Sequence, residues 1–218
     1  NLISMNTELL RPITSKEVDT YHRDGVLLLK NMFEKDWIKI LNNGLDVNIE
    51  KPTKSSRIWY KDTSGRSMFY DHTAWQNIDE YKKFIFNSPA AKISGHLTGS
   101  ATINFFFDSV FVRSTGTQFE TPWHQDEPYW SVEGYDACTI WMPLAPVKKK
   151  SSLSFVPGSH LWKTVFKHYN FGDLNPVGKK NVDQVDFSDI AEQELPDINS
   201  DPERFGVVSW DMQAGDCI

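Results

Sequence analysis

The residues of this sequence best suited to chemistry are His124 and Asp126, which are separated by one residue. On an extended chain, residues i and i+2 point to the same side, so both side chains can reach one metal ion. On a helix the same spacing turns them about 200° apart. The pattern also occurs at His22 and Asp24. There we interpret it as a polar helix terminus, because Gly25 follows and ends a predicted helix.

The sequence around His124 and Asp126 favours an extended, pocket-like setting. Pro122 and Pro128 bracket the pair and exclude a helix interior. Aromatic residues surround it, namely Trp123, Tyr129 and Trp130. An imidazole and a carboxylate, completed by a second imidazole, form the facial triad that suits iron(II) and dioxygen chemistry. The alternative is a turn in which the Asp126 carboxylate caps a neighbouring backbone amide.

The bulk properties limit the classes of protein that fit. The 218 residues suffice for one sizeable domain, with 39% hydrophobic and 24% charged residues. A net charge of −6 argues against a nucleic-acid partner. The 2 cysteines, Cys138 and Cys217, show neither a metal-binding spacing nor a disulfide framework, so we expect a cytoplasmic location. No apolar run is long enough to span a membrane, so no membrane partner is expected.

The elements that must position the pair follow from the hydrophobic pattern. The first hundred residues predict helices, beginning with one capped at Thr14 that ends at Gly25, and a second capped at Asp36. Further helices are expected at 79–86 and 89–97, and one short strand at 26–29. A long strand is expected over 103–113, short strands over 138–142 and 153–156, and another strand over 205–209. A polar, acidic insertion separates the last two, at about 164–202.

This order predicts a single α+β domain over residues 1–218. Residues 1–100 form its helical N-terminal part, and residues 101–218 form a mainly β core of sandwich or jelly-roll type. A jelly roll needs about eight strands, and fewer are found here. We therefore expect the C-terminal strands to be missing and the sequence to be a truncated form.

Five segments resemble the phytanoyl-CoA dioxygenase family, in order and in spacing. The first is Thr-Pro-Trp-His-Gln-Asp-Glu-Pro-Tyr-Trp at 121–130, which is similar to the family's iron-binding segment. The others are Tyr-His-Arg-Asp-Gly at 21–25, Thr-Ile-Trp-Met-Pro-Leu at 139–144, Phe-Val-Pro-Gly-Ser-His at 155–160 and Ala-Gly-Asp-Cys-Ile at 214–218. The resemblance implies a double-stranded β-helix, which is a cupin-like jelly roll. It also implies an iron(II)- and 2-oxoglutarate-dependent dioxygenase that hydroxylates a small molecule and releases succinate and carbon dioxide.

The resemblance also assigns roles to residues of the site. It makes His124 and Asp126 iron ligands and places the third ligand, a His, just beyond Ile218, together with an Arg for the far carboxylate of 2-oxoglutarate. His160 is expected to make a structural hydrogen bond instead. Four residues match positions near the cosubstrate: Arg113, Trp141, Gln118 and Thr121. A surface Arg at the sheet edge and a Trp packed in the core are the alternatives for the first two.

A substrate pocket is expected next to this centre. Residues 52–75 are predicted to form part of a lid, and the candidate substrate contacts are Arg57, Trp59, Tyr60, Tyr129 and Trp130. The sequence leaves the substrate and the oligomeric state open.

Two other functions are compatible with the same fold. A halogenase replaces the metal-binding carboxylate by a small residue, and the presence of Asp126 argues against it. A non-catalytic jelly roll would bind a small molecule through an aromatic surface that includes Trp123.

Overall fold

The computed structural model describes residues 5–59, 61–117, 120–130, 132, 134, 136–167 and 193–218. Its α-helices are α1 (Ser15–Asp24), α2 (Lys35–Glu50), α3 (Asp79–Asn87) and α4 (Ala90–Thr98). Its strands are β1 (Arg57–Trp59), β2 (Met68–His72) and β3 (Ser109–Arg113). Short 3-10 turns are η1 (Ala74–Gln76), η2 (Glu127–Tyr129), η3 (Lys149–Ser151) and η4 (Ser159–Leu161). No described helix is long and apolar enough to cross a membrane.

Helix α1 begins and ends at the predicted residues. The Thr14 side chain accepts a hydrogen bond from the Glu17 N–H, and the Glu17 carboxylate accepts one from the Thr14 N–H. This reciprocal capping box satisfies two backbone donors that the first turn leaves open. Gly25 ends the helix with φ of 69°, a left-handed conformation that favours glycine.

The core is assembled from segments that are distant in sequence. Trp37 on α2 and Ile93 on α4 are each 1% exposed, and they pack with Leu29, Met32 and Cys217. Helix α2 begins two residues earlier than predicted: Glu34 is its N-cap and makes no side-chain capping bond. The prediction of a cap at Asp36 was therefore wrong, and Asp36 lies in the first turn, where an acidic side chain favours the helix dipole.

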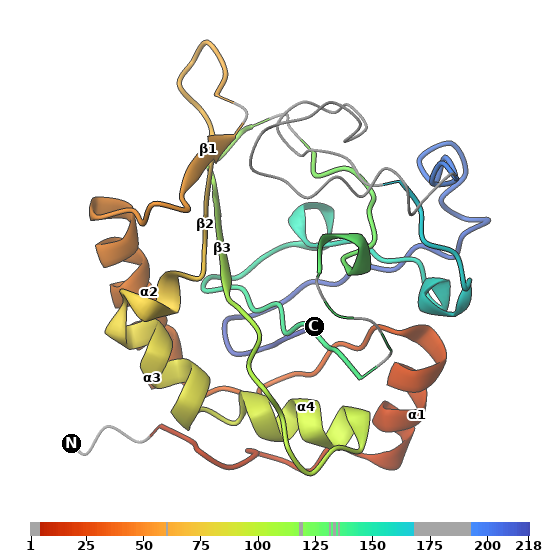
Figure 1. Cartoon of the computed structure of the whole chain (residues 1–218), viewed down its shortest axis with the longest axis horizontal. Coiled ribbons are helices and arrows are strands. Elements are labelled where there is room, and N and C mark those ends of the chain that lie inside the picture. Colours follow the sequence, from red (N-terminus) through yellow and green to blue (C-terminus); the bar gives the residue numbers. More distant parts are fainter. Residues whose placement is uncertain are drawn as a thin grey trace.

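Strands β1, β2 and β3 form one antiparallel sheet in that order. The sequence analysis missed β1 and β2, because β1 is three residues long and follows a polar, turn-rich stretch. Its register puts Trp59 opposite Met68, which in turn lies opposite Arg113, so these three side chains share a face. Figure 1 shows α2 and α3 on one side of the strands and most of the second half of the chain on the other.

A buried carboxylate fixes the sheet to α2. Asp71 on β2 is 0% exposed and accepts hydrogen bonds from Asn48 of α2 and from both the N–H and the hydroxyl of Thr53. Burial raises the pKa of Asp71, but these bonds outweigh it and hold the pKa below its ordinary value. Asp71 lies on the other face of β2 from Met68, so this other face is held against the helices.

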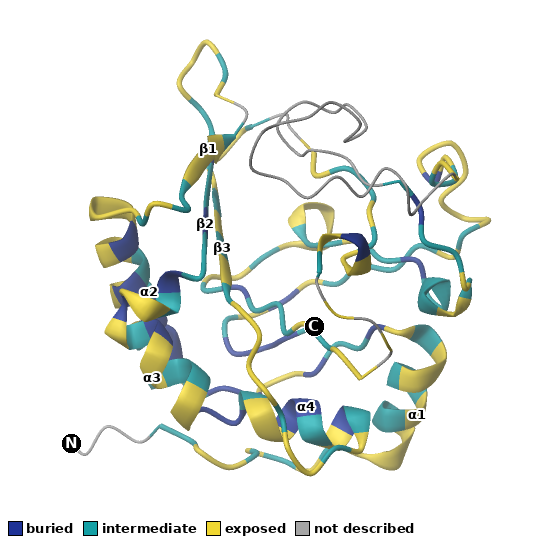
Figure 2. Cartoon of the chain, viewed as in Figure 1, coloured by how far each residue is buried: buried dark blue, intermediate teal, exposed yellow. Residues whose placement is uncertain are grey.

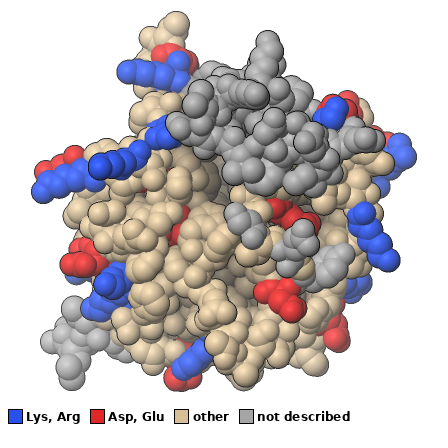
Figure 3. Space-filling view, in the orientation of Figure 1, with Lys and Arg blue, Asp and Glu red and all other residues tan. Residues whose placement is uncertain are grey.

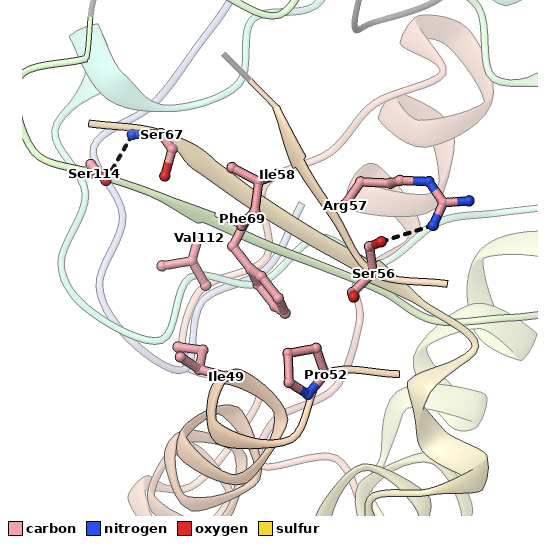
Figure 4. Close-up of a pocket in the computed structure, with 9 residues that line it drawn as sticks. All are labelled: Ile49, Pro52, Ser56, Arg57, Ile58, Ser67, Phe69, Val112 and Ser114. Atoms are coloured by element: carbon pink, nitrogen blue, oxygen red, sulfur yellow. Dashed lines mark hydrogen bonds between the residues drawn. The ribbon is translucent and has the colours of Figure 1, made fainter. Parts of the chain in front are cut away.

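A cavity of about 350 Å³ lies on this same helix-facing side of the sheet. Ile58, Phe69 and Val112 from the three strands line it together with Ile49 and Pro52 at the end of α2, and Figure 4 shows Phe69 directed toward the last two. Arg57 lies at its rim, where its guanidinium donates to the Ser56 carbonyl. The sheet separates this cavity from the side that carries Arg113.

The second half of the chain is extended but forms few regular ladders. Only 109–113 of the predicted strand 103–113 is a strand. The predicted strands at 153–156 and 205–209 meet at one bridge, Phe155 with Val208, and the strand at 26–29 is a bridge between Leu29 and Cys217. These strand predictions were wrong in extent, because a strand requires a partner along its whole length.

The ends of the predicted insertion pack into the molecule. Phe166 is 7% exposed and Ile198 is 3% exposed, although the stretch 164–202 reads as polar. Figure 2 shows buried residues within these flanking segments. Residues 168–192 lie outside the described part of the chain.

Candidate functional site

His124 and Asp126 converge on one side of the metal loop, which we define as residues 121–130. The distance between His124 Nε2 and Asp126 Oδ1 is 3.2 Å. Their side chains are 27% and 51% exposed, so an ion could reach both. The loop begins to turn at Asp126, the N-cap of η2, whose carbonyl accepts a hydrogen bond from the Tyr129 N–H. The structure thus brings together the two side chains that the spacing pairs.

The other ring nitrogen of His124 is held by the backbone. Nδ1 lies 2.8 Å from the Pro122 carbonyl oxygen, which can only accept a hydrogen bond, so Nδ1 carries a proton. Burial lowers the pKa of His124, but the bonds to Asp126 and Pro122 outweigh it and raise the pKa above its ordinary value. A protonated Nε2 can thus donate to Asp126, and a metal ion would replace that proton.

This arrangement fits a first-row metal ion. Metal-binding histidines usually donate their second N–H to a carbonyl or carboxylate, as Nδ1 of His124 does. Two ligand atoms roughly 2.1 Å from an ion and at right angles are roughly 3 Å apart, close to the 3.2 Å between Nε2 and Oδ1. Among the described residues, no cluster of three His, Cys, Asp or Glu side chains could hold a metal ion. A third ligand therefore stays a prediction.

Two residues predicted to bind the cosubstrate are joined directly. The Arg113 guanidinium donates a 2.9 Å hydrogen bond to the Thr121 hydroxyl. Arg113 ends β3 and Thr121 opens the metal loop, three residues before His124. This bond places a cation at the junction of the sheet and the loop, although contact with a cosubstrate stays a prediction.

The other two predicted cosubstrate residues give less information. Trp141 exchanges two backbone hydrogen bonds with Ile218, of 2.8 and 2.9 Å. Its neighbours Ile140 and Met142 pack against the core, so alternation directs the Trp141 side chain to the other side. Gln118 lies outside the described residues.

Aromatic side chains line the sheet face that carries Arg113. Trp59 stacks on Tyr70 with ring centroids 4.4 Å apart and an interplanar angle of 13°. Phe111, which pairs with Tyr70 in the register, lies 5.0 Å from it and is 50% exposed. The alternation of residues 68, 70 and 72 was the available signal for Tyr70, but the sequence analysis missed it.

Two aromatic side chains of the metal loop contact neighbouring rings. Tyr129 meets His124 edge to face at 6.1 Å, and Trp130 meets Phe106 edge to face at 6.3 Å. Arg57, by contrast, is turned toward backbone carbonyls, and Tyr60 lies outside the described part of the chain. The substrate roles of all these residues remain predictions.

The first copy of the His-x-Asp pattern, His22 and Asp24, makes contacts that hold the fold together. Asp24 pairs with the neighbouring Arg23, at 2.7 Å. Its carbonyl accepts a hydrogen bond from the Gly158 N–H, and the His22 carbonyl lies 3.1 Å from Nε2 of His160. The prediction of a polar helix terminus is confirmed, as is the structural hydrogen bond of His160.

Solved structures share this fold. The carbocyclase SnoK from nogalamycin biosynthesis, described as non-heme and alpha ketoglutarate dependent, aligns with a TM-score of 0.64 and 18% identity over 94% of this chain and 73% of its own. EvdO2 from Micromonospora carbonacea var. aurantiaca, complexed with 2-oxoglutarate, gives 0.61 and 16% over 96% and 81%. The epimerase SnoN, in complex with Fe3+, alpha ketoglutarate and nogalamycin RO, gives 0.57 and 17% over 93% and 71%.

The family comparison covers most of the chain. No curated protein matches the sequence. The family model for phytanoyl-CoA dioxygenase matches residues 21–218, which include His124, Asp126 and Arg113. The expectation of an oxygenase-type enzyme that uses iron and 2-oxoglutarate is thereby confirmed. The chain belongs to the phytanoyl-CoA dioxygenase family.

Proposed function

We propose that this chain is an iron(II)- and 2-oxoglutarate-dependent dioxygenase that hydroxylates a small organic molecule and releases succinate and carbon dioxide. The observation that carries the proposal is the convergence of His124 Nε2 and Asp126 Oδ1 while the Pro122 carbonyl holds Nδ1. We assign the single bridges of the second half, such as Phe155 with Val208, to the paired positions of a double-stranded β-helix.

The residues of the proposed iron centre have different roles. His124 and Asp126 would hold the iron, which together with 2-oxoglutarate and dioxygen supplies the oxidation of a C–H bond. Asp126 occupies the position that a halogenase leaves open for a halide, so hydroxylation is favoured. The Pro122 carbonyl fixes the ring of His124 in the orientation that keeps Nε2 directed at the ion.

Arg113 is the residue proposed to bind a carboxylate of 2-oxoglutarate. Its guanidinium bonds the Thr121 hydroxyl and lies 3.7 Å from the Met68 sulfur, and these contacts with described residues use only part of its hydrogen-bonding capacity. A carboxylate is the partner that a planar guanidinium binds best. Replacing Arg113 by Met should therefore weaken 2-oxoglutarate binding more than iron binding.

The substrate is proposed to contact the aromatic face of the sheet. Tyr70 and Phe111 share that face with Arg113, and Tyr129 adjoins His124. Figure 3 shows most Lys and Arg side chains around the periphery of the displayed face, with some Asp and Glu side chains nearer its centre. An apolar small molecule suits the aromatic face of the sheet, since burying it removes apolar area from water.

The decisive experiment is an anaerobic titration of the full-length protein. Iron(II) and 2-oxoglutarate added together should give the weak visible charge-transfer band of the chelate, and oxygen should then release succinate. A protein that gives neither the band nor succinate is a binding module without catalysis, and the proposal is wrong. Arg113→Met should keep the iron affinity and require at least about tenfold more 2-oxoglutarate for the same band.

A further inference from the structure

The residue between the two proposed iron ligands has a side chain bound to a different part of the molecule. The Gln125 amide donates a 2.8 Å hydrogen bond to the Thr164 carbonyl and accepts one of 2.8 Å from the Phe166 N–H. One side-chain amide thus pairs with a backbone segment in the way a neighbouring strand would. Both partners are backbone groups with fixed roles, so the orientation of the amide is determined.

The segment that Gln125 binds is itself anchored. The Phe166 ring is buried and meets Trp162 edge to face at 5.9 Å. The next residue, Lys167, donates its N–H to the Gln193 carbonyl at 2.9 Å and pairs with Glu194. The Gln125 amide is therefore hydrogen-bonded to a segment that other contacts hold in place, so this segment cannot move freely with the loop.

A second side chain of the metal loop makes an equivalent connection. The indole N–H of Trp123 donates a 2.8 Å hydrogen bond to Oδ1 of Asn199, the residue after the buried Ile198. Trp123 and Gln125 flank His124, and on extended backbone both point away from the side that His124 and Asp126 share. The side chains of Trp123 and Gln125, one on each side of His124, therefore bind the face of the loop that lies away from the proposed ligands to the rest of the molecule.

Such support matters because this loop lacks a ladder of its own. In the described part of the loop, the internal backbone bonds are those from the Tyr129 and Trp130 N–H groups near its end, and none precedes Asp126. A rotation of the backbone around residue 125 would swing both ligands together, and metal sites respond strongly to ligand direction. Side chains that fix the backbone behind the proposed ligands would therefore affect iron binding without contacting the ion.

We propose that Gln125, assisted by Trp123, is a positioning residue that sets the directions of His124 and Asp126. This inference rests on the proposed function. An amide is required at residue 125 because Thr164 offers an acceptor and Phe166 a donor. A carboxylate could accept from Phe166 but would face the Thr164 carbonyl oxygen without a proton to share.

The test compares two isosteric amide-to-carboxylate changes in the full-length protein. Gln125→Glu alters the support of the loop. Asn42→Asp is the matched control, because the Asn42 amide donates to the Ile38 and Leu144 carbonyls, away from the loop. Unfolding midpoints and anaerobic iron(II) affinity in the presence of 2-oxoglutarate are measured for both. We expect Gln125→Glu to bind iron(II) about 10- to 100-fold more weakly and to shift the visible band of the chelate, and Asn42→Asp to do neither.

Trp123→Phe provides a second, milder test. It keeps an aromatic ring and removes only the indole N–H, so folding should be retained and iron(II) affinity should fall severalfold. The proposal is overturned if Gln125→Glu and Trp123→Phe bind iron(II) within twofold of the wild type, or if Asn42→Asp loses as much affinity. If the wild-type protein itself binds no iron(II), the proposed function fails and this inference falls with it, which the wild-type titration alone reveals.

Discussion

The chain contains the same pattern twice, and the two copies have different surroundings. In the copy His22-Arg23-Asp24, the pattern ends a helix, and Asp24 pairs with Arg23 beside it. In the copy His124-Gln125-Asp126, the residues before Asp126 are neither helix nor strand, and the imidazole and carboxylate come within 3.2 Å of each other. Identical spacing thus gives divergent side chains in one place and convergent ones in the other.

The intervening residue strengthens this contrast. Arg23 binds the neighbouring carboxylate and so neutralises it locally, whereas the Gln125 amide binds a different segment. The backbone carbonyls of His22 and Asp24 serve as acceptors for the 157–160 turn, which makes the first copy a docking point. The proline-bracketed loop leaves the second copy accessible to an ion.

Removing the carboxylate of the second copy should have the largest effect. Asp126→Ala deletes one of the two proposed ligands and should lower iron(II) affinity at least about 100-fold, because changes behind metal ligands already cost 10- to 100-fold. The affinity is measured by anaerobic titration with 2-oxoglutarate. Asp24→Ala is the matched control and should leave the affinity unchanged. Equal losses in the two variants would refute the distinction between the copies.

Disrupting the contact between the 157–160 turn and the helix end at His22-Arg23-Asp24 should lower the stability of the fold and leave iron(II) affinity unchanged. A Cβ on Gly25 would lie 2.3 Å from Nδ1 of His160, and Gly25 has φ of 69°. Gly25→Ala should destabilise the fold by about 2–4 kcal/mol, the sum of left-handed strain and overpacking. Chemical denaturation measures the loss.

Gly99 provides the control for that substitution. It ends α4 with φ of 70°, yet nothing lies within 4 Å of the position of its Cβ. Gly99→Ala should therefore cost only the left-handed strain, about 1–2 kcal/mol. In a double-mutant cycle with His160→Ala, the excess cost at Gly25 should shrink. Equal costs at the two glycines would show that the 157–160 turn does not press on the helix end.

The smallest effect concerns the start of the helix that carries the first copy. Hydrogen bonds from Arg11, assisted by those from Thr14, lower the pKa of Glu17 from 4.5 to about 2, although burial opposes the shift. Because the folded pKa is depressed, the stabilisation is fully present above about pH 4.5 and is lost as pH falls toward 2. Glu17→Gln should cost about 1 kcal/mol at pH 7 and little at pH 2. A cost independent of pH would contradict this account.

Local signals in the sequence predicted a large part of the fold. The capping residues and Gly25 predicted α1, and the two bracketing prolines correctly excluded an α-helix from the metal loop, although Pro128 lies in the short 3-10 turn η2. Such features act within a few residues, so sequence alone contains them. Three-residue β1 and the single-position bridges depend on partners distant in the chain, which no local pattern reveals.

The same distinction applies to the site. Spacing singled out His124 and Asp126 because both proposed ligands lie on one short segment. The bond between Arg113 and Thr121 spans eight residues, and that between Gln125 and Thr164 spans 39. These supports arise only when the segments are folded against each other, so the sequence analysis recognised Arg113 by resemblance and missed Gln125.

We expect one iron ion to lie between His124 Nε2 and Asp126 Oδ1 and none at His22 and Asp24. Crystals of the full-length protein grown anaerobically with iron(II) and 2-oxoglutarate would test this through anomalous diffraction at the iron absorption edge. A single strong peak should appear roughly 2.1 Å from both proposed ligand atoms. A peak at the first copy, or a peak elsewhere with His124 and Asp126 still bonded to each other, would contradict it.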